Sequence, residues 1–140
     1  MRKKSATTLN SSATGRTALA GKILLVLCIL FLLFDAVGKI MLEPHSVKGT
    51  LALGWPAYTV RPVGIVLLLA TIVYSIPRTR IPGAILVTAF LGGATATMVR
   101  VGEPFYFAVV FGMLVWTAVI LLNPVLKNVL LGLKNKRSIL

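Results

Sequence analysis

The chain has 140 residues, of which 57% are hydrophobic and only 13% are charged, whereas soluble globular domains carry about 25% charged residues. A chain this short cannot bury so many apolar side chains in a fold surrounded by water, so the composition excludes a soluble domain and indicates one membrane domain. Its net charge of +12 is not accompanied by the alternating basic and aromatic residues of nucleic-acid-binding surfaces, and it favours the positive-inside pattern of membrane proteins instead.

The first segment, residues 1–17, is basic and rich in Ser, Thr and Ala. We expect it to form a disordered cytoplasmic tail, because it lacks the apolar side chains that would order it. A cleavable signal peptide ending near residues 36–38 is the alternative. The long polar start and a helical pattern that continues to Leu42 favour a retained segment.

Four apolar segments predict transmembrane helices at about residues 18–42, 62–76, 82–99 and 105–122. Gly102 and Pro104 interrupt the pattern between the last two, and Pro124 ends the fourth. The predicted fold class is therefore all-α, with a four-helix transmembrane bundle over residues 18–124.

Two further segments are predicted to lie on the membrane surface. The loop 43–61 contains a stretch too apolar for a free loop, which Pro44 can open and Gly54 can end as a short helix. We expect this helix to be interfacial, in the first outer loop. Residues 125–140 combine helically spaced apolar positions with lysines, which predicts a basic amphipathic cytoplasmic tail.

The distribution of charge predicts the orientation. The tails and the turn between the second and third helices carry eleven bases and no acid: Arg2, Lys3, Lys4, Arg16, Lys22, Arg78, Arg80, Lys127, Lys134, Lys136 and Arg137. The opposite side has four bases (Lys39, Lys48, Arg61 and Arg100) and all three acids (Asp35, Glu43 and Glu103). The positive-inside rule then places both termini in the cytoplasm, in a multi-pass protein of the inner (plasma) membrane.

Charged residues near the outer helix ends form the candidate binding site. Asp35 falls inside the predicted first helix, where an unpaired carboxylate costs a few kcal/mol, and Lys39 follows it at the favourable i+4 spacing. Arg61 and Arg100 are expected at the same depth, and Glu103 joins them at the outer mouth of the bundle. Two interpretations remain open: a site for an anionic or quinone-type ligand, and an ion-pair network that joins the helix ends.

The third predicted helix carries small residues at every fourth position: Ala89, Gly93 and Thr97 in one series, and Gly92 and Ala96 in another. This spacing is typical of closely packed membrane helices. A cavity lined by Thr95 and Thr97 is the alternative.

The chain has few side chains that could ligate a metal ion or form a disulfide. Cys28 is the only cysteine and His45 the only histidine. We therefore expect no metal site, no internal disulfide and no cofactor ligands within the chain.

The segment IPRTRIPGAILVTAFLGGATATMVRVGEPFYFAVVFGMLVW at 76–116, with LFDAVGK at 33–39, resembles the DoxX-like family of small four-helix membrane proteins over about residues 20–125. The resemblance implies the same four-helix architecture with both ends inside, but no particular reaction. The family takes its name from a subunit associated with thiosulfate:quinone oxidoreduction, and related proteins are linked to membrane redox complexes. This chain has Leu67 in place of an acid common early in the second helix, and Met98 in place of a histidine, so an intrinsic enzyme is disfavoured.

The resulting functional expectation is a DoxX-like integral membrane protein that acts as an accessory or quinone- or anion-binding subunit, with the redox centre on a partner subunit. Two alternatives remain. One is a small proton-coupled transporter that uses Asp35 as its membrane carboxylate, and the other is a structural or chaperone-like membrane subunit.

Overall fold

The computed structural model describes the backbone of residues 2–132 and the side chains of residues 15–132, and every regular element within these ranges is a helix. The elements are, in order, α1 (Arg2–Ile40), α2 (Pro44–Ala52), the 3-10 helix η1 (Ala57–Thr59), α3 (Val60–Ser75), the 3-10 helix η2 (Pro77–Thr79), α4 (Arg80–Val101), α5 (Tyr106–Leu122) and α6 (Pro124–Leu130). The predicted all-α fold class is thus confirmed for the described residues.

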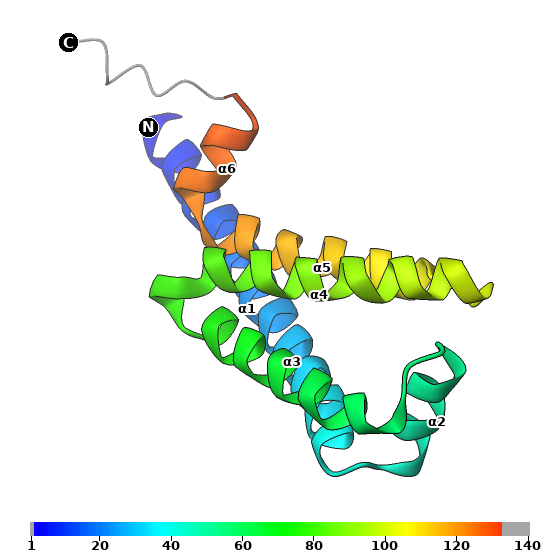
Figure 1. Cartoon of the computed structure of the whole chain (residues 1–140). Coiled ribbons are helices and arrows are strands. Elements are labelled where there is room, and N and C mark those ends of the chain that lie inside the picture. The colour runs from blue at the N-terminus through cyan, green and yellow to red at the C-terminus, as the bar shows by residue number, and fades with distance from the viewer. Residues whose placement is uncertain (1, 133–140) are drawn as a thin grey trace.

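Two helical pairs make up the molecule (Figure 1). Helix α1 lies beside α3, and α4 lies beside α5. The pairs are close together near the α3–α4 turn, on the side of the N-terminus, and diverge toward α2 and the α4–α5 turn. We call the first side the packed end and the second the open end.

Helix α1 is longer than the sequence predicted. It begins at Arg2 and passes through the segment for which we expected a disordered tail. Residues 2–20 contain no proline and only one glycine. Because extending an existing helix costs far less than nucleating one, the apolar stretch 23–34 can propagate its helix backwards through this segment.

Helix α2 occupies the loop in which a short helix was predicted. The Glu43 carboxylate accepts a hydrogen bond from the Ser46 N–H at 3.1 Å and caps the helix, and Pro44 fills its first turn. After α2 the chain turns at Gly54, whose φ is +82°, a value that glycine adopts at little cost.

The remaining helices follow the predicted segments within a few residues, and the differences arise at their ends. Helix α4 ends at Gly102 in the left-handed conformation, with φ +77°. Asn123 separates α5 from α6, which are bent by 112° relative to each other. Helix α6 occupies the first part of the predicted amphipathic tail, and residues 133–140 lie outside the described residues.

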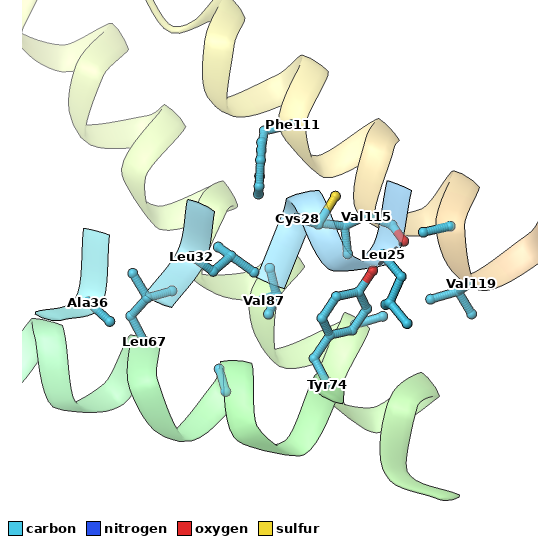
Figure 2. Close-up of a cluster of buried hydrophobic side chains, with 13 residues drawn as sticks. Leu25, Cys28, Leu32, Ala36, Leu67, Tyr74, Val87, Phe111, Val115 and Val119 are labelled. Carbon is cyan, nitrogen blue, oxygen red and sulfur yellow. Dashed lines mark hydrogen bonds between the residues drawn. The ribbon is translucent and has the colours of Figure 1, made fainter. Parts of the chain in front are cut away.

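The core is concentrated toward the packed end (Figure 2). It consists of buried residues from α1, α3, α4 and α5: Leu25, Cys28, Leu32, Ala36, Leu67, Ala70, Tyr74, Ala84, Val87, Phe111, Val115, Ala118 and Val119. The Tyr74 hydroxyl donates a hydrogen bond to the Val115 carbonyl at 3.0 Å and so links α3 to α5. In α4 the buried residues are Gly83, Ala84 and Val87, all in its first two turns. Beyond these, Phe90 and Leu91 are only partly buried against the core, and the end of α4 has no buried residue.

Glycines permit the closest helix contacts at this end. A Cβ added to Gly83 would lie 2.3 Å from the backbone N and Cα of Tyr74, and one added to Gly21 would lie 2.9 Å from Leu121 Cβ. The first turn of α4 therefore rests directly on the last turn of α3, which only a residue without a side chain allows.

The surface of the helices suits a lipid environment. Gly15–Ile40, Ala57–Ser75 and Pro77–Val101 are each long and apolar enough to cross a membrane, and α5 with α6 would make a fourth span if the bent pair counts as one. Six hydroxyls on these helices donate to a carbonyl four residues earlier: Thr71, Ser75, Thr88, Thr95, Thr97 and Thr117. Polar groups bonded within their own helix are compatible with lipid.

Candidate functional site

A cleft of about 420 Å³ opens where α4 diverges from α1 and α3. It follows from the distribution of the core, because the second half of α4 has no helix packed against its inner face. The cleft lies beneath the α2 segment, and Thr50, Leu53 and Trp55 contribute to its lining. Most of its other lining side chains are apolar, and they include Phe31, Leu32, Val63, Leu67, Phe90, Leu91, Met98, Phe107 and Phe111.

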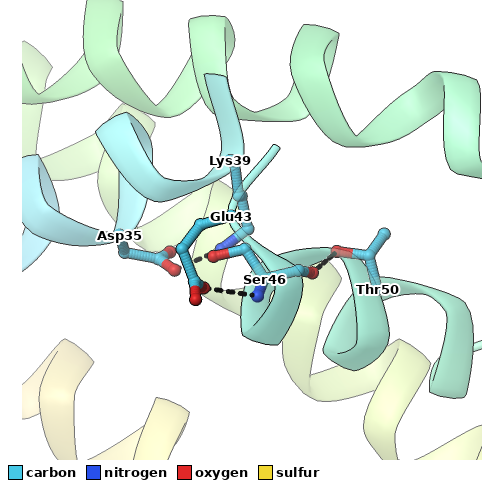
Figure 3. A network of polar contacts seen from close by, with 5 residues as sticks. All are labelled: Asp35, Lys39, Glu43, Ser46 and Thr50. Atoms are coloured by element: carbon cyan, nitrogen blue, oxygen red, sulfur yellow. Dashed lines mark hydrogen bonds and ion pairs between the residues drawn. The ribbon is translucent and has the colours of Figure 1, made fainter. Parts of the chain in front are cut away.

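One ion pair lies in the wall of this cleft (Figure 3). The Lys39 ammonium donates to the Asp35 carboxylate from one helical turn away, the spacing at which such pairs meet on α1. The two side chains are partly buried, with 16% of Lys39 and 35% of Asp35 exposed. The pair carries no net charge, so it offers hydrogen-bonding groups to a ligand without attracting a particular sign of charge.

Three aromatic rings form a second part of the wall. The Phe31 ring lies 4.8 Å from that of Phe111 and 5.3 Å from that of Phe107, centroid to centroid. Phe31, Asp35 and Lys39 recur at every fourth position of α1, so the rings and the ion pair lie along one face of that helix. This surface can contact a flat ring and hydrogen-bond a polar group next to it.

A more open hollow of about 660 Å³ adjoins the cleft at the open end. The three acidic residues of the chain and its only histidine all line it: Asp35, Glu43, His45 and Glu103. Asp35 and Lys39 line both spaces. Glu43 is occupied as the cap of α2. Within the described residues, no three His, Cys, Asp or Glu side chains are arranged to hold a metal ion.

The five charged residues predicted as one site are divided by the structure. Asp35 and Lys39 meet in the cleft, and Glu103 lines only the adjoining hollow. The Arg61 Nε donates to the Ile40 carbonyl at 3.2 Å, and the Arg100 Nη2 lies 3.4 Å from the Leu53 carbonyl. Both arginines thus hold the segment around α2, because backbone carbonyls at helix ends need donors.

Of the small residues of α4 for which a helix contact was predicted, the two glycines face open space. No atom of another element lies within 4 Å of a Cβ added to Gly92 or Gly93, because α4 stays beside α5 but diverges from α1 and α3 along this stretch (Figure 1). Ala89, Gly93 and Thr97 line the cleft, which agrees with the cavity interpretation, whereas Thr95 does not line it. Ala96 lines a smaller hollow of about 320 Å³ beside Arg100.

Several lining residues were not singled out from the sequence. Phe31 precedes Asp35 by one helical turn, so it could have been identified as the next residue on the helix face that carries Asp35 and Lys39. Trp55 and Phe111 carry no comparable signal, because their place depends on how the helical pairs diverge. Away from the cleft, the Trp116 Nε1 donates to the Thr88 hydroxyl at 2.7 Å and joins α5 to α4.

Comparison with known proteins identifies one relationship. The model of the DoxX-like family matches residues 23–121, which contain the core, the cleft and α2. Searches of the curated proteins and of the solved structures each found no match.

Proposed function

The chain belongs to the DoxX-like family, a family of membrane proteins without an assigned reaction, and we propose that it is a membrane-embedded binding subunit for a quinone-type molecule. The cleft between α4 and the α1–α3 pair is the observation that carries the proposal. Its apolar walls suit a ligand dissolved in the bilayer, and its single ion pair suits an uncharged head that accepts hydrogen bonds.

The arrangement of the lining residues supports a ligand orientation. A quinone ring would lie against Phe31 and Phe111, with a carbonyl oxygen accepting from the Lys39 ammonium. An isoprenoid tail would follow the small side chains of α4 at Ala89 and Gly93. An anionic head is the weaker match, because Asp35 neutralises the cation and the adjoining hollow is rich in acids.

The proposed setting is a four-span protein of the inner (plasma) membrane with both termini in the cytoplasm. The distribution of bases supports this orientation. In this setting α2 lies at the outer surface and the cleft opens in the outer leaflet. A redox partner subunit would supply the electron-transfer centre, and the chain would act as an accessory subunit and not as an enzyme by itself.

Tryptophan fluorescence tests the proposal, because a bound quinone quenches a nearby indole. Trp55 lines the cleft and Trp116 does not, so the Trp116→Phe variant leaves one reporter at the site. We expect a soluble short-chain quinone, titrated into this variant in detergent, to quench Trp55 saturably. Linear, unsaturable quenching would contradict the proposal.

A pair of neighbouring glycines provides the matched variants. Gly93→Leu places a side chain in the cleft, whereas Gly92→Leu adds the same side chain next to it on an exposed part of α4 that does not line the cleft. We expect Gly93→Leu to weaken quinone binding at least about tenfold, a loss of about 1.4 kcal/mol, and Gly92→Leu to leave it unchanged. Equal effects of both substitutions would argue against the cleft as the site.

Two alternative functions, a transporter and a structural subunit, can each be distinguished from quinone binding by a separate measurement. A proton-coupled transporter would use Asp35 as its carboxylate, and its flux in proteoliposomes would fall in the Asp35→Asn variant. A structural or chaperone-like subunit would co-purify with a membrane partner, and its partner would be lost or unstable in cells that lack it. Saturable quinone binding without flux favours the binding subunit.

A further inference from the structure

Basic residues dominate the packed end of the molecule. The elements on this side are the first part of α1, the α3–α4 turn and α6 (Figure 1), and their described cations are Arg16, Lys22, Arg78, Arg80 and Lys127, whereas the three acids line the hollow at the open end. Among the residues whose side chains are described, no carboxylate therefore balances these cations, and they are available to an anion from outside.

The turn between α3 and α4 holds two of these cations in a fixed geometry. The Thr79 hydroxyl donates to the Val73 carbonyl at 2.8 Å, and the Thr79 N–H donates to the Ile76 carbonyl at 3.1 Å. The close contact of Gly83 with Tyr74 locks the start of α4 against α3. Arg78 and Arg80, on either side of Thr79, are thus presented by a rigid backbone.

One donor at this turn has no acceptor in the described part of the chain. The Nε of Arg80 is buried and makes no hydrogen bond there. The Thr79 side chain, which could have capped the first N–H groups of α4, is bonded to Val73 instead. The buried Nε of Arg80 is out of reach from outside, but the side chain as a whole is only half-buried, and its charged guanidinium can donate to an external anion. The positive end of the α4 dipole adds to the attraction for an anion.

The surface beside the arginines is apolar. Ile76 and Ile81 flank the turn with 46% and 37% of their surface exposed, and Ile72 and Ile85 continue the exposed apolar surface along α3 and α4. A free phosphate ion would use only the arginines. A phospholipid would use both features, because its phosphate can bond the guanidinium groups while its acyl chains cover the isoleucines.

We propose that the α3–α4 turn binds the headgroup of an anionic phospholipid through Arg78 and Arg80. The site lies at the opposite end from the cleft and does not depend on the function proposed for the cleft. Arginine suits this role because its planar fork can donate two hydrogen bonds to one phosphate.

Lipid titrations of the purified chain in a neutral detergent test this site. Dioleoyl phosphatidylglycerol, dioleoyl phosphatidylcholine and inorganic phosphate are added separately, and bound lipid is counted by native mass spectrometry. We expect phosphatidylglycerol to bind at least about fivefold more tightly than phosphatidylcholine. Inorganic phosphate at the same concentration should leave the binding of phosphatidylglycerol unchanged.

Single charge-removing variants locate the binding. Arg80→Gln and Arg78→Gln should each weaken phosphatidylglycerol binding about fivefold, whereas Lys48→Gln, which removes an exposed cation from α2 at the open end, should not. Arg78 is exposed, so its variant decides the matter if Arg80→Gln does not fold. Equal binding of the two lipids, an equal loss in Lys48→Gln, or full competition by inorganic phosphate would overturn the proposal.

Discussion

The two ends of the molecule use the same kinds of helix in opposite ways. At the packed end, Gly83 brings α4 against the backbone of Tyr74, and the core fills the space between all four long helices. At the open end, Gly92 and Gly93 of the same helix meet no neighbour, and the space beside α4 becomes a cleft. A small residue therefore permits close approach but does not impose it, because a facing helix must also be present.

The largest difference in stability between the two ends is expected when a glycine at each end is replaced by alanine. Gly83→Ala forces a Cβ against the backbone of α3, which cannot move as a flexible side chain can. We expect a loss of about 3 kcal/mol in the free energy of unfolding, measured in detergent by circular dichroism. Gly92→Ala is the matched control and should be neutral or slightly stabilising, since alanine has the higher helix propensity. Similar losses in both variants would remove the contrast between the ends.

The link between α3 and α5 at the packed end should give the next largest effect. Tyr74→Phe removes a buried hydroxyl that bonds the Val115 carbonyl, and we expect a loss of about 1 kcal/mol in the same unfolding measurement. Tyr58→Phe removes a hydroxyl from a side chain that is 79% exposed, and it should change stability little. Equal stability of Tyr74→Phe and the parent chain would show that this bond does not hold the packed end together.

At the open end, the Asp35–Lys39 ion pair should contribute slightly less to the free energy of unfolding than the Tyr74 hydrogen bond does. Asp35→Asn leaves Lys39 partly buried without its carboxylate, for which we expect a loss of about 0.5–1 kcal/mol. A double-mutant cycle with Lys39→Met should recover part of this loss, because the remaining cation is also removed. Glu103→Gln is the control, because Glu103 is exposed. A coupling energy of zero in the cycle would mean that the pair is not formed in the membrane.

The smallest effect is expected for the bond that joins α4 and α5. Trp116→Phe removes the indole donor to the Thr88 hydroxyl, and interhelical hydrogen bonds in membranes average about 0.6 kcal/mol. Thr88→Val should cost a similar amount, and the double variant should cost no more than either alone. Additive losses would show that the two side chains act independently of each other.

The helices could be predicted from the sequence, and the cleft could not. Apolar runs and breakers such as Pro44, Gly102 and Pro124 predicted the helices, because these signals are local. The start of α1 differed from the prediction, because a helix that extends into a polar segment leaves no hydrophobic periodicity in the sequence. Asp35 and Lys39 were predicted as a pair because they share a turn. Arg61 and Arg100 were assigned to the same cluster, but Arg61 bonds the carbonyl at the end of α1 and Arg100 lies against the Leu53 carbonyl after α2, and both positions depend on how the chain folds back.

The unequal lengths of the apolar helices have a consequence for the surrounding bilayer. The apolar part of α1, Gly15–Ile40, has 26 residues and is about 39 Å long, whereas α5 has 17 residues and is about 25 Å long. A hydrocarbon layer of about 30 Å lets α1 span it with some tilt and leaves α5 too short to cross it upright. Hydrophobic mismatch therefore tends to thin the bilayer beside α5, which would bias the protein toward thinner membrane regions.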